Sequence, residues 1–386
     1  MERIALHNSG RIAPFLQPRR LHHKRVSSAR KTSLSLFNPP TGNTNPAIPF
    51  PQAVPVQTHD SSGGGLSPLK AQVQSFWQGS PCDSWFTDEK QGTPDFYRTL
   101  DEHRYQVHPR LHEAAGFEKA RGKRVLEIGC GCGSEAERFA RAGASYTAVD
   151  LTNAAVSITQ RRFQLNGLNG CFTQGDAENL PFADGSFDVV YSHGVLHHTP
   201  DTPKTIREVH RVLAPGGRAS IMLYYQNSFN YQVNLRIVRR LRALLLKSEL
   251  GIKLSRKIWH EPEEELRRHA ELVKQDPDAY LDMQNMLNRN TDGPDNPLSQ
   301  VFSKESGSDM FWQFKNVKTE VMFWNPNYLP GIGKLLPKSI ENWLASRWGW
   351  HLWIYADKSP QENAGQSVAC PVKVGVSQVQ TEAFAG

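Results

Sequence analysis

The sequence lacks the features that would place it across a membrane or in an oxidising compartment. It contains no run of about 18 apolar residues, so no segment is expected to span a bilayer. Its five cysteines are an odd number and lack the paired spacing of a secreted disulfide framework. We therefore expect reduced thiols and a cytoplasmic protein.

Most of the chain also lacks a surplus of positive charge, although the formal net charge is +7. Residues 1–66 hold eight Lys and Arg side chains against Glu2 and Asp60, so this segment alone carries +6. The other 320 residues carry +1. A nearly neutral body has no overall electrostatic attraction for polyanions, so no nucleic-acid partner is expected.

Residues 1–66 have few periodic apolar residues and are rich in Pro, Ser, Asn and Gly. Such a composition buries too little surface to offset the entropy of ordering, which predicts a disordered basic extension. The first 37 residues are rich in Arg and Ser and poor in acids, as mitochondrial transit peptides are. A mitochondrial location is therefore the alternative to the cytoplasm.

The centre of the chain is a glycine turn at residues 124–134, which read RVLEIGCGCGS. A short apolar run, three alternating glycines and a helical pattern predict the first half of a βαβ unit. The glycines allow a tight turn and close approach of the backbone to a ligand, and the helix behind them offers free N–H groups. Cys130 and Cys132 have no further Cys or His pair at ligand spacing, so no metal site is expected.

The spacing of this turn distinguishes between nucleotide-like ligands. A dinucleotide fingerprint would place its third glycine at position 134, which is Ser134. Glu127 precedes the first glycine by two residues, and the loop supplies no cation for a pyrophosphate. This favours S-adenosylmethionine, which carries a positive sulfonium and amine and no phosphate. A nicotinamide-dependent oxidoreductase is disfavoured, and a plain strand-to-helix turn is the remaining alternative.

Carboxylates follow the next strands of the predicted sheet. Asp150 ends the second strand, 19 residues after Gly131, where a carboxylate can accept both ribose hydroxyls. Asp176 follows the third strand and is placed to accept from an adenine amine, with Ala177 leaving room for the ring. The strands after the first are expected at 145–150, around 171–173, at 187–192 and at 219–225.

Residues 121 to about 225 resemble a class I S-adenosylmethionine-dependent methyltransferase of the type 11 small-molecule group. The matching motifs are VLEIGCGCG (125–133), Asp150, GDAENLPF (175–182), SFDVVYS (186–192) and LAPGG (213–217). The resemblance implies S-adenosyl-L-methionine as cofactor, held by Glu127, Gly129, Gly131, Gly133, Asp150, Leu151, Asp176, Ala177, Ser192 and His193. It leaves the acceptor open, because this group methylates many kinds of small molecule.

The resemblance also implies the fold, an α/β, Rossmann-like, doubly wound sheet of seven mostly parallel strands. Alternating patterns at 317–323 and 350–356 predict two further strands. The resemblance implies that these are the last two strands of the sheet, the final one antiparallel and inserted between the fifth and sixth. The expected organisation is a basic extension (1–66), a helical N-terminal lid (67–120), the cofactor-binding core (121–225), a helical cap insertion (226–305), the last two strands (306–358) and a flexible tail (359–386).

The helical segments outside the core carry two further expectations. Trp85, Phe96, Tyr97 and Tyr105 are candidates to line a lid over the cofactor or acceptor, with ordinary packing as the alternative. The pair His108-Pro109 is expected to end a helix, because a residue before proline avoids the α region.

Within the insertion, apolar residues at 233, 237, 241 and 244 form one helical stripe with arginines largely off it. We expect this stripe to pack against the parent domain, as part of a cap beside the acceptor pocket. Docking on a membrane or on an acidic partner is the alternative.

Candidate catalytic residues follow the fourth strand. Methyl transfer from a sulfonium is an in-line displacement that needs a general base only when the acceptor must lose a proton. His197 and His198 lie near the carboxyl end of that strand, where open α/β sheets bind ligands, and imidazole titrates near neutrality. They are the candidate bases, and packing or capping is the alternative role for His197.

The favoured function is therefore transfer of a methyl group to a small, partly apolar acceptor. The Asp/Asn-Pro-Pro motif of nucleic-acid amino-methyltransferases is absent after the fourth strand, where the chain reads Tyr191-Ser192-His193-Gly194. The alternatives are a lipid or quinone methyltransferase that works at a membrane surface, and a cofactor-binding module without methyl transfer that regulates or binds a partner.

Overall fold

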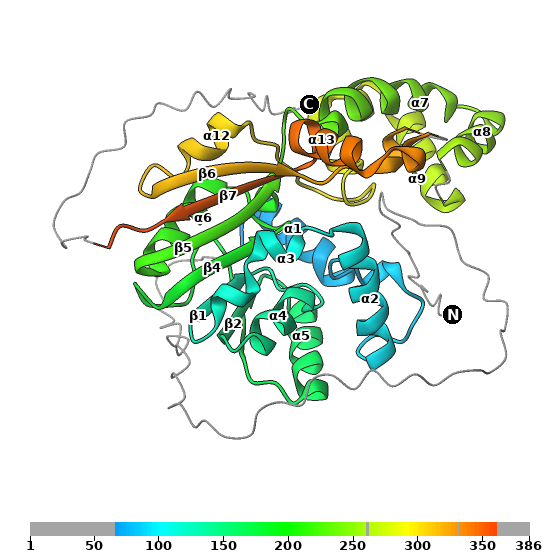
Figure 1. Cartoon of the computed structure of the whole chain (residues 1–386). Helices are drawn as coiled ribbons and strands as arrows, with labels where there is room; N and C mark the ends of the chain where they lie inside the picture. Colours follow the sequence, from blue (N-terminus) through cyan, green and yellow to red (C-terminus); the bar gives the residue numbers. More distant parts are fainter. Residues whose placement is uncertain (1–65, 260–261, 330–331, 361–386) are drawn as a thin grey trace, which may run out of the picture.

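The computed structural model describes residues 66–259, 262–329 and 332–360. The predicted basic extension (1–66), with its transit-like first 37 residues, and the predicted tail (359–386) lie almost entirely outside these residues. A seven-stranded sheet with the order β3-β2-β1-β4-β5-β7-β6 organises the described part of the chain (Figure 1). Its strands are β1 (Arg124–Ile128), β2 (Ser145–Asp150), β3 (Cys171–Gln174), β4 (Phe187–His193), β5 (Leu213–Tyr224), β6 (Lys315–Met322) and β7 (His351–Asp357).

The strand directions confirm the predicted doubly wound fold. The first five strands pair in parallel, and β7 runs antiparallel between β5 and β6. Strand β1 lies between β2 and β4, so the glycine turn that follows it opens at the middle of the sheet. The strand order reverses on either side of β1, and this is the position at which open α/β sheets bind their ligands.

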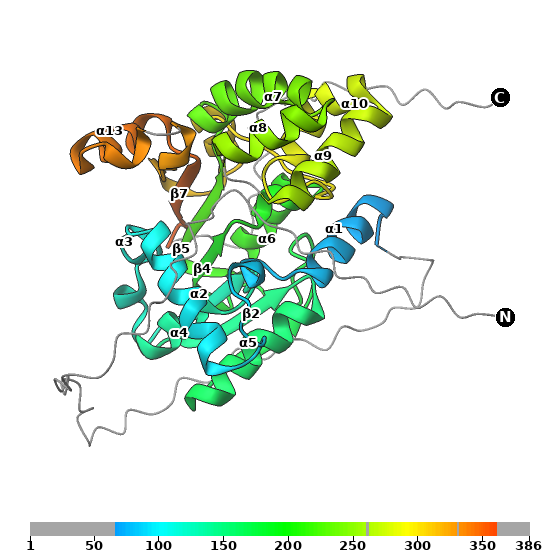
Figure 2. The same cartoon turned by 90° about the vertical axis from the view of Figure 1, so that its right-hand side faces the viewer.

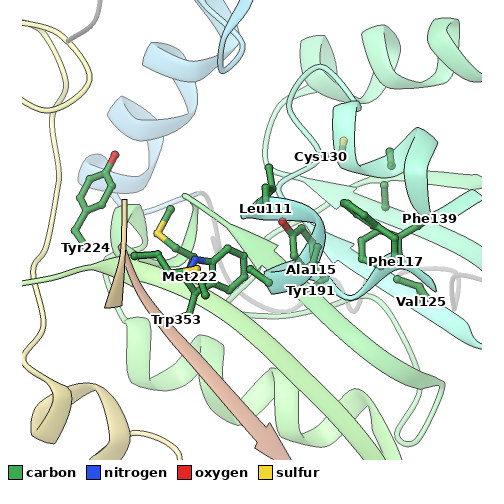
Figure 3. Close-up of a cluster of buried hydrophobic side chains, with 14 of the residues drawn as sticks. Leu111, Ala115, Phe117, Val125, Cys130, Phe139, Tyr191, Met222, Tyr224 and Trp353 are labelled. Atoms are coloured by element: carbon green, nitrogen blue, oxygen red, sulfur yellow. The ribbon is translucent and has the colours of Figure 1, made fainter. Parts of the chain in front are cut away.

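Each face of the sheet carries its own apolar core. Figure 3 shows one of them, in which Phe139 lies near Phe117 and Val125, while Tyr191 lies beside Trp353. The second core joins Leu126 and Ile128 with residues of the helix between β4 and β5. Alternate residues of β1 thus enter different cores, because successive side chains of a strand point to opposite faces. The helices in contact with the strands are α4 (Ser134–Arg141), α5 (Asn153–Asn166), α6 (Thr202–Val212), α12 (Lys304–Asp309) and α13 (Lys338–Trp348).

The segment before β1 is helical, as predicted. It comprises α1 (Pro68–Gly79), η1 (Ser84–Phe86), α2 (Pro94–Val107), α3 (Leu111–Ala115) and η2 (Phe117–Ala120). Helix α2 ends at Val107, and His108 caps it by donating its backbone N–H to the Arg104 carbonyl. This confirms the predicted effect of the following proline.

The insertion between β5 and β6 forms a helical layer at one end of the molecule (Figures 1 and 2). It contains the π-helix η4 (Asn230–Arg239), α7 (Arg240–Leu245), α8 (Glu249–Trp259), α9 (Glu263–Gln275), α10 (Pro277–Leu281) and α11 (Met283–Arg289), and α12 follows it. Among the described residues, no helix is long and apolar enough to cross a bilayer.

The prediction that the apolar stripe of this insertion packs against the parent domain is wrong. Ile237, Leu241 and Leu244 are 53%, 60% and 56% exposed, whereas Leu235 and Arg242 are buried. The helical period is correct, since Leu235, Arg239, Arg242 and Leu246 follow the same spacing and are buried, but the apolar stripe is not the side that packs inward. The stripe therefore faces solvent.

The connection from β6 to β7 contains a helix that the sequence did not predict. Helix α13 follows two short turns, η5 (Pro326–Tyr328) and η6 (Gly333–Leu335), and packs against β6. The last strands lie within two residues of their expected positions.

Candidate active site

The glycine turn after β1 forms the floor of a cavity at the carboxyl edge of the sheet. Gly129, Gly131 and Gly133 all have positive φ, at 81°, 50° and 78°. A Cβ on Gly129 would lie 2.2 Å from a methyl carbon of Val195, so no larger residue fits there without movement. The turn thus needs glycine for its backbone conformation and, at Gly129, for its close contact with the segment after β4.

Asp150, at the end of β2, places a carboxylate beside this turn. One oxygen accepts from the backbone N–H and the hydroxyl of Thr152, at 2.9 and 2.8 Å. The other lies 3.4 Å from the backbone nitrogen of Gly131, which leaves it capacity for a ligand hydroxyl. Burial raises the pKa of Asp150, and the hydrogen bonds from Thr152 and Gly131 act in the opposite direction.

The loop after β3 brings Asp176 and Ala177 to the same cavity, where helix α1 crosses over it. Lys70 of α1 lies 2.6 Å from an Asp176 oxygen and 2.7 Å from a Glu178 oxygen. The other Asp176 oxygen accepts from the Glu178 backbone N–H at 2.9 Å. Lys70, Val73 and Trp77 face the cavity from above, which leaves it narrow, at about 110 Å³.

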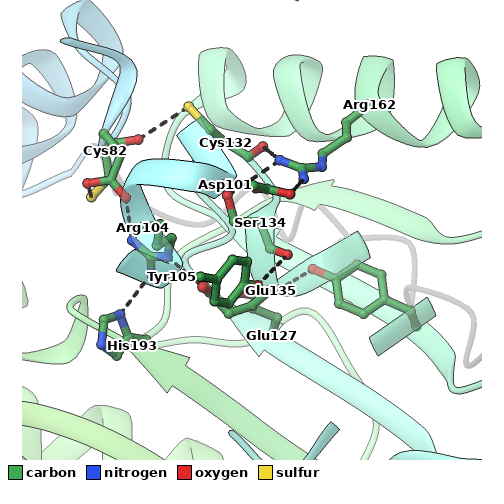
Figure 4. A network of polar contacts seen from close by, with 12 residues as sticks. Cys82, Asp101, Arg104, Tyr105, Glu127, Cys132, Ser134, Glu135, Arg162 and His193 are labelled. Atoms are coloured by element: carbon green, nitrogen blue, oxygen red, sulfur yellow. Dashed lines mark hydrogen bonds and ion pairs between the residues drawn. The ribbon is translucent and has the colours of Figure 1, made fainter. Parts of the chain in front are cut away.

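A buried arginine joins the N-terminal helices to the turn (Figure 4). Arg104 of α2 forms a two-pronged ion pair with Glu135, in the first turn of α4, at 2.5 and 2.7 Å. The same guanidinium donates a hydrogen bond to the Asp83 carboxylate and lies 2.9 Å from Nδ1 of His193. Glu135 also lies where the positive end of the α4 dipole favours a carboxylate.

Comparison with known proteins gives a family match for the centre of the chain. A family model described as a methyltransferase domain matches residues 126–221. These residues, which run from β1 into β5, therefore match a methyltransferase domain.

The curated relatives match the chain over part of its length. A phthiotriol/phenolphthiotriol dimycocerosates methyltransferase of Mycobacterium leprae is 47% identical over 108 residues, which is 28% of this chain and 39% of the relative. A fatty-acid O-methyltransferase of Mycolicibacterium smegmatis is 43% identical over the same length, again 28% of this chain and 39% of the relative. The chain thus spans about two fifths of the length of the curated relatives it matches.

Among solved structures, magnesium protoporphyrin IX methyltransferase of Synechocystis, with bound SAH, aligns at 14% identity and a TM-score of 0.44. The alignment covers 75% of this chain and 100% of the Synechocystis chain.

Most of the predicted cofactor contacts come together in the cavity of the methyltransferase domain. The residues that line it are Gly129, Gly131, Gly133, Asp150, Leu151, Asp176, Ala177 and His193. Glu127 and Ser192 do not. The Glu127 carboxylate is buried below the turn and accepts from the Tyr146 hydroxyl, and the Ser192 hydroxyl donates to the Ile128 carbonyl at 2.8 Å. In this structure both side chains stabilise the strands that carry the turn.

The two candidate bases occupy different environments. His197 is fully buried, with its ring 3.6 Å from the Tyr224 ring, and it lines no described cavity. Burial, followed by the neighbouring His198, lowers the pKa of His197 well below its usual value. His198 does line the cavity, and its Nδ1 donates to the Leu298 carbonyl at 2.6 Å. A neutral His198 therefore carries its lone pair on Nε2.

His193 joins this cavity to a second one. Because a guanidinium only donates, Nδ1 of His193 accepts from Arg104 and its proton lies on Nε2. Burial, and then the charge of Arg104, holds the pKa of His193 well below its usual value, so the ring is neutral at physiological pH. With Arg104 in place, His193 is a hydrogen-bond donor and cannot serve as a base.

The second cavity is larger, about 630 Å³, and lies between α2, β6, β7 and α13. Aromatic rings form much of its wall, and His351 stacks on Phe323 with ring centroids 4.6 Å apart. Trp353 and His193 close its inner end, where the His193 ring stacks on Trp353 at 5.3 Å. No described residue of the 226–305 insertion lines either cavity.

Sequence reasoning missed the N-terminal residues of the first cavity. Phe96 and Tyr97 are buried against Ile158 and Cys132 instead of lining it, and Trp77 takes the position expected of a lid aromatic. Lys70 and Arg104 gave no local signal, because a charged residue on an amphipathic helix is usually solvated. Lys70 pairs with Glu178, 108 residues away in the chain, and the carboxylate partners of Arg104 lie 21 and 31 residues away.

Proposed function

We propose that the chain transfers a methyl group from S-adenosylmethionine to a small, partly apolar acceptor. The observation that carries the proposal is the meeting of two cavities at His193. One is floored by the glycine turn and Asp150, and the other is walled by aromatic rings. Such an arrangement allows a donor methyl and an acceptor atom to be aligned while water is excluded, which is the main requirement of this reaction.

The charges around the first cavity suit a cationic nucleoside. Asp83, Glu135, Asp150 and Asp176 line it. Among the described lining residues, the basic side chains are Lys70 and Arg104, and carboxylates already hold both. A sulfonium and an amine are therefore favoured over a pyrophosphate, which would need free cations or free helix N–H groups.

We assign the second cavity to the acceptor. The aromatic rings in its wall favour an apolar molecule. The relatives are named for phthiotriol dimycocerosates and for fatty acids, and these names point to lipid-like acceptors for those proteins. The His193 Nε2–H can donate to an acceptor oxygen. His198, with its lone pair on Nε2, is the better candidate for a proton acceptor where the acceptor must lose a proton.

The N-terminal helices supply the lid. Helix α1 and Lys70 narrow the first cavity to about 110 Å³, so we propose that α1 moves outward when the nucleoside enters and returns once it is bound. We also propose that the protein works in the cytoplasm, because its five cysteines lack the paired spacing of a secreted disulfide framework.

Formation of S-adenosylhomocysteine tests the function. Purified full chain incubated with S-adenosylmethionine and a set of fatty acids and polyketide-like diols should release S-adenosylhomocysteine only when an acceptor is supplied. Asp150→Ala should reduce turnover at limiting cofactor, and Asp184→Asn, at an exposed site, should not. Cofactor binding without turnover across lipid-like and polar acceptors would favour a regulatory module instead.

A further inference from the structure

The outward side of the insertion combines exposed apolar residues on two consecutive helices. Ile237 of η4 and Leu241 and Leu244 of α7 follow i, i+4, i+7 spacing and are all more than half exposed. On α8, Leu250 is 77% exposed and Leu254 is 42% exposed. These five side chains are hereafter the α7–α8 face. Adjacent helices rarely leave this many large apolar residues in water without a partner.

Basic side chains surround the α7–α8 face. Residues 230–259 contain eight Lys and Arg and one acidic residue, so these 30 residues carry +7. Because residues 67–386 carry only +1 together, the remainder of that segment carries −6. Six of the basic residues are exposed between or beside the apolar ones, namely Arg236, Arg240, Lys247, Lys253, Arg256 and Lys257, and Arg256 pairs with Glu263 of α9.

Helix α13 adds interfacial aromatic residues at the same end of the molecule, as both views show (Figures 1 and 2). Trp343 and Trp348 are 51% and 47% exposed and contact each other with ring centroids 5.8 Å apart. Exposed tryptophans favour the boundary between headgroups and acyl chains. Another side of the same helix lines the second cavity through Glu341 and Ala345.

We propose that the α7–α8 face, with α13, docks the protein on the surface of an anionic lipid bilayer. The helices lie in the interface with their apolar residues among the acyl chains and their basic residues at the headgroups. The acceptor would then reach the second cavity from the bilayer along α13, and this last step rests on the proposed function. Docking itself does not depend on methyl transfer.

The charges distinguish a bilayer from a protein partner. Lysine is depleted in protein–protein interfaces, whereas Lys and Arg on the polar side of an amphipathic helix are typical of helices that lie on membranes. Lys247, Lys253 and Lys257 flank the apolar side chains on α7 and α8. A second copy of the chain would bring two +7 segments together, which like-charge repulsion disfavours.

Co-sedimentation with vesicles tests the proposal. The full chain is mixed with vesicles of phosphatidylcholine alone, or of phosphatidylcholine with phosphatidylserine, and should bind the anionic vesicles far more tightly. Leu241→Ser with Leu244→Ser should weaken this binding by about 10-fold or more. Arg240→Gln with Lys247→Gln should weaken it by about 30-fold, at roughly 1 kcal/mol for each basic residue near the surface.

Matched variants away from the α7–α8 face provide the controls. Leu165→Ser on α5, where Leu165 is 37% exposed, is the control for the leucine variants, and Arg98→Gln on α2 is the control for the basic ones. Both controls should leave vesicle binding unchanged. All variants keep residues 1–66, so the +6 of that segment contributes equally to each. Circular dichroism confirms that each variant is folded.

Three outcomes would overturn the proposal. These are no vesicle binding, binding that is equal in all variants, and a dimer in sedimentation velocity that the Leu241/Leu244 variant dissociates. The last would assign the face to a second copy. A short-chain acceptor added in solution separates the two proposals, because failed docking with retained S-adenosylhomocysteine formation rejects only this inference.

Discussion

Replacement of Asp150 by Asn perturbs the cofactor site with little change in shape. The amide oxygen can still accept from the N–H and hydroxyl of Thr152, so the end of β2 should keep its conformation. The other oxygen becomes an NH₂ group that faces the Gly131 N–H, and the acceptor available to a ribose hydroxyl is lost. A hydrogen bond to a charged group contributes about 1.5–3 kcal/mol, which predicts roughly 10- to 150-fold weaker binding.

Calorimetric titration with S-adenosylhomocysteine measures this loss. Because burial raises the pKa of Asp150, the wild-type affinity should also fall as the pH drops through that raised value, whereas Asp150→Asn should show no such fall. Asp184→Asn is the control, since its side chain is 80% exposed and pairs only with Arg211 among described residues. An unchanged affinity in a folded Asp150→Asn protein would remove this carboxylate from the site and refute the reasoning.

Three further predictions concern stability. Gly129→Ala should lower the free energy of unfolding, measured in urea, by about 2–5 kcal/mol, because the new Cβ clashes with Val195 and position 129 has a positive φ. A second substitution, Val195→Ala, should restore part of this stability. A Gly129→Ala protein as stable as the wild type would contradict the close contact. Lys70→Met leaves the carboxylates of Asp176 and Glu178 without their cation and should cost about 1–3 kcal/mol in thermal unfolding. The cost is below that of a fully buried pair because Asp176 is 26% exposed and Glu178 keeps the hydrogen bond from the Asp201 N–H; an unchanged melting temperature would reject the ion pairs. Burial lowers the pKa of His351 to about 3, below its unfolded value of about 6.5. The stabilisation from the neutral His351 is therefore complete above pH 6.5, and about 2 kcal/mol of the free energy of unfolding is lost by pH 5. His351→Phe should reduce that loss, and the same pH dependence of stability in the variant and the wild type would contradict this.

The sequence predicted all seven strands of the sheet because local patterns determine them. The strand ending at Asp150 and the turn around Gly131 are where alternation and glycine spacing placed them. Both signals are short-range, since a buried parallel strand needs an apolar run and a positive φ needs glycine.

The features that were missed depend on tertiary structure. The stripe through Leu241 faces solvent because the side of the helix that carries Leu235 and Arg242 packs inward, and a helical period alone does not say which side is buried. Lys70 and Arg104 became parts of the site only because distant carboxylates lie opposite them. His197 was a reasonable candidate base by position, but packing on Tyr224 encloses it. Dependence on contacts between segments distant in sequence therefore limited what could be predicted.

The most direct test is a crystal structure of the full chain with S-adenosylhomocysteine. The account predicts ribose hydroxyls within hydrogen-bond distance of Asp150, adenine beside Ala177, and the sulfur pointing past His193 toward the second cavity. A nucleoside bound elsewhere, or a sulfur separated from the second cavity by packed protein, would contradict it.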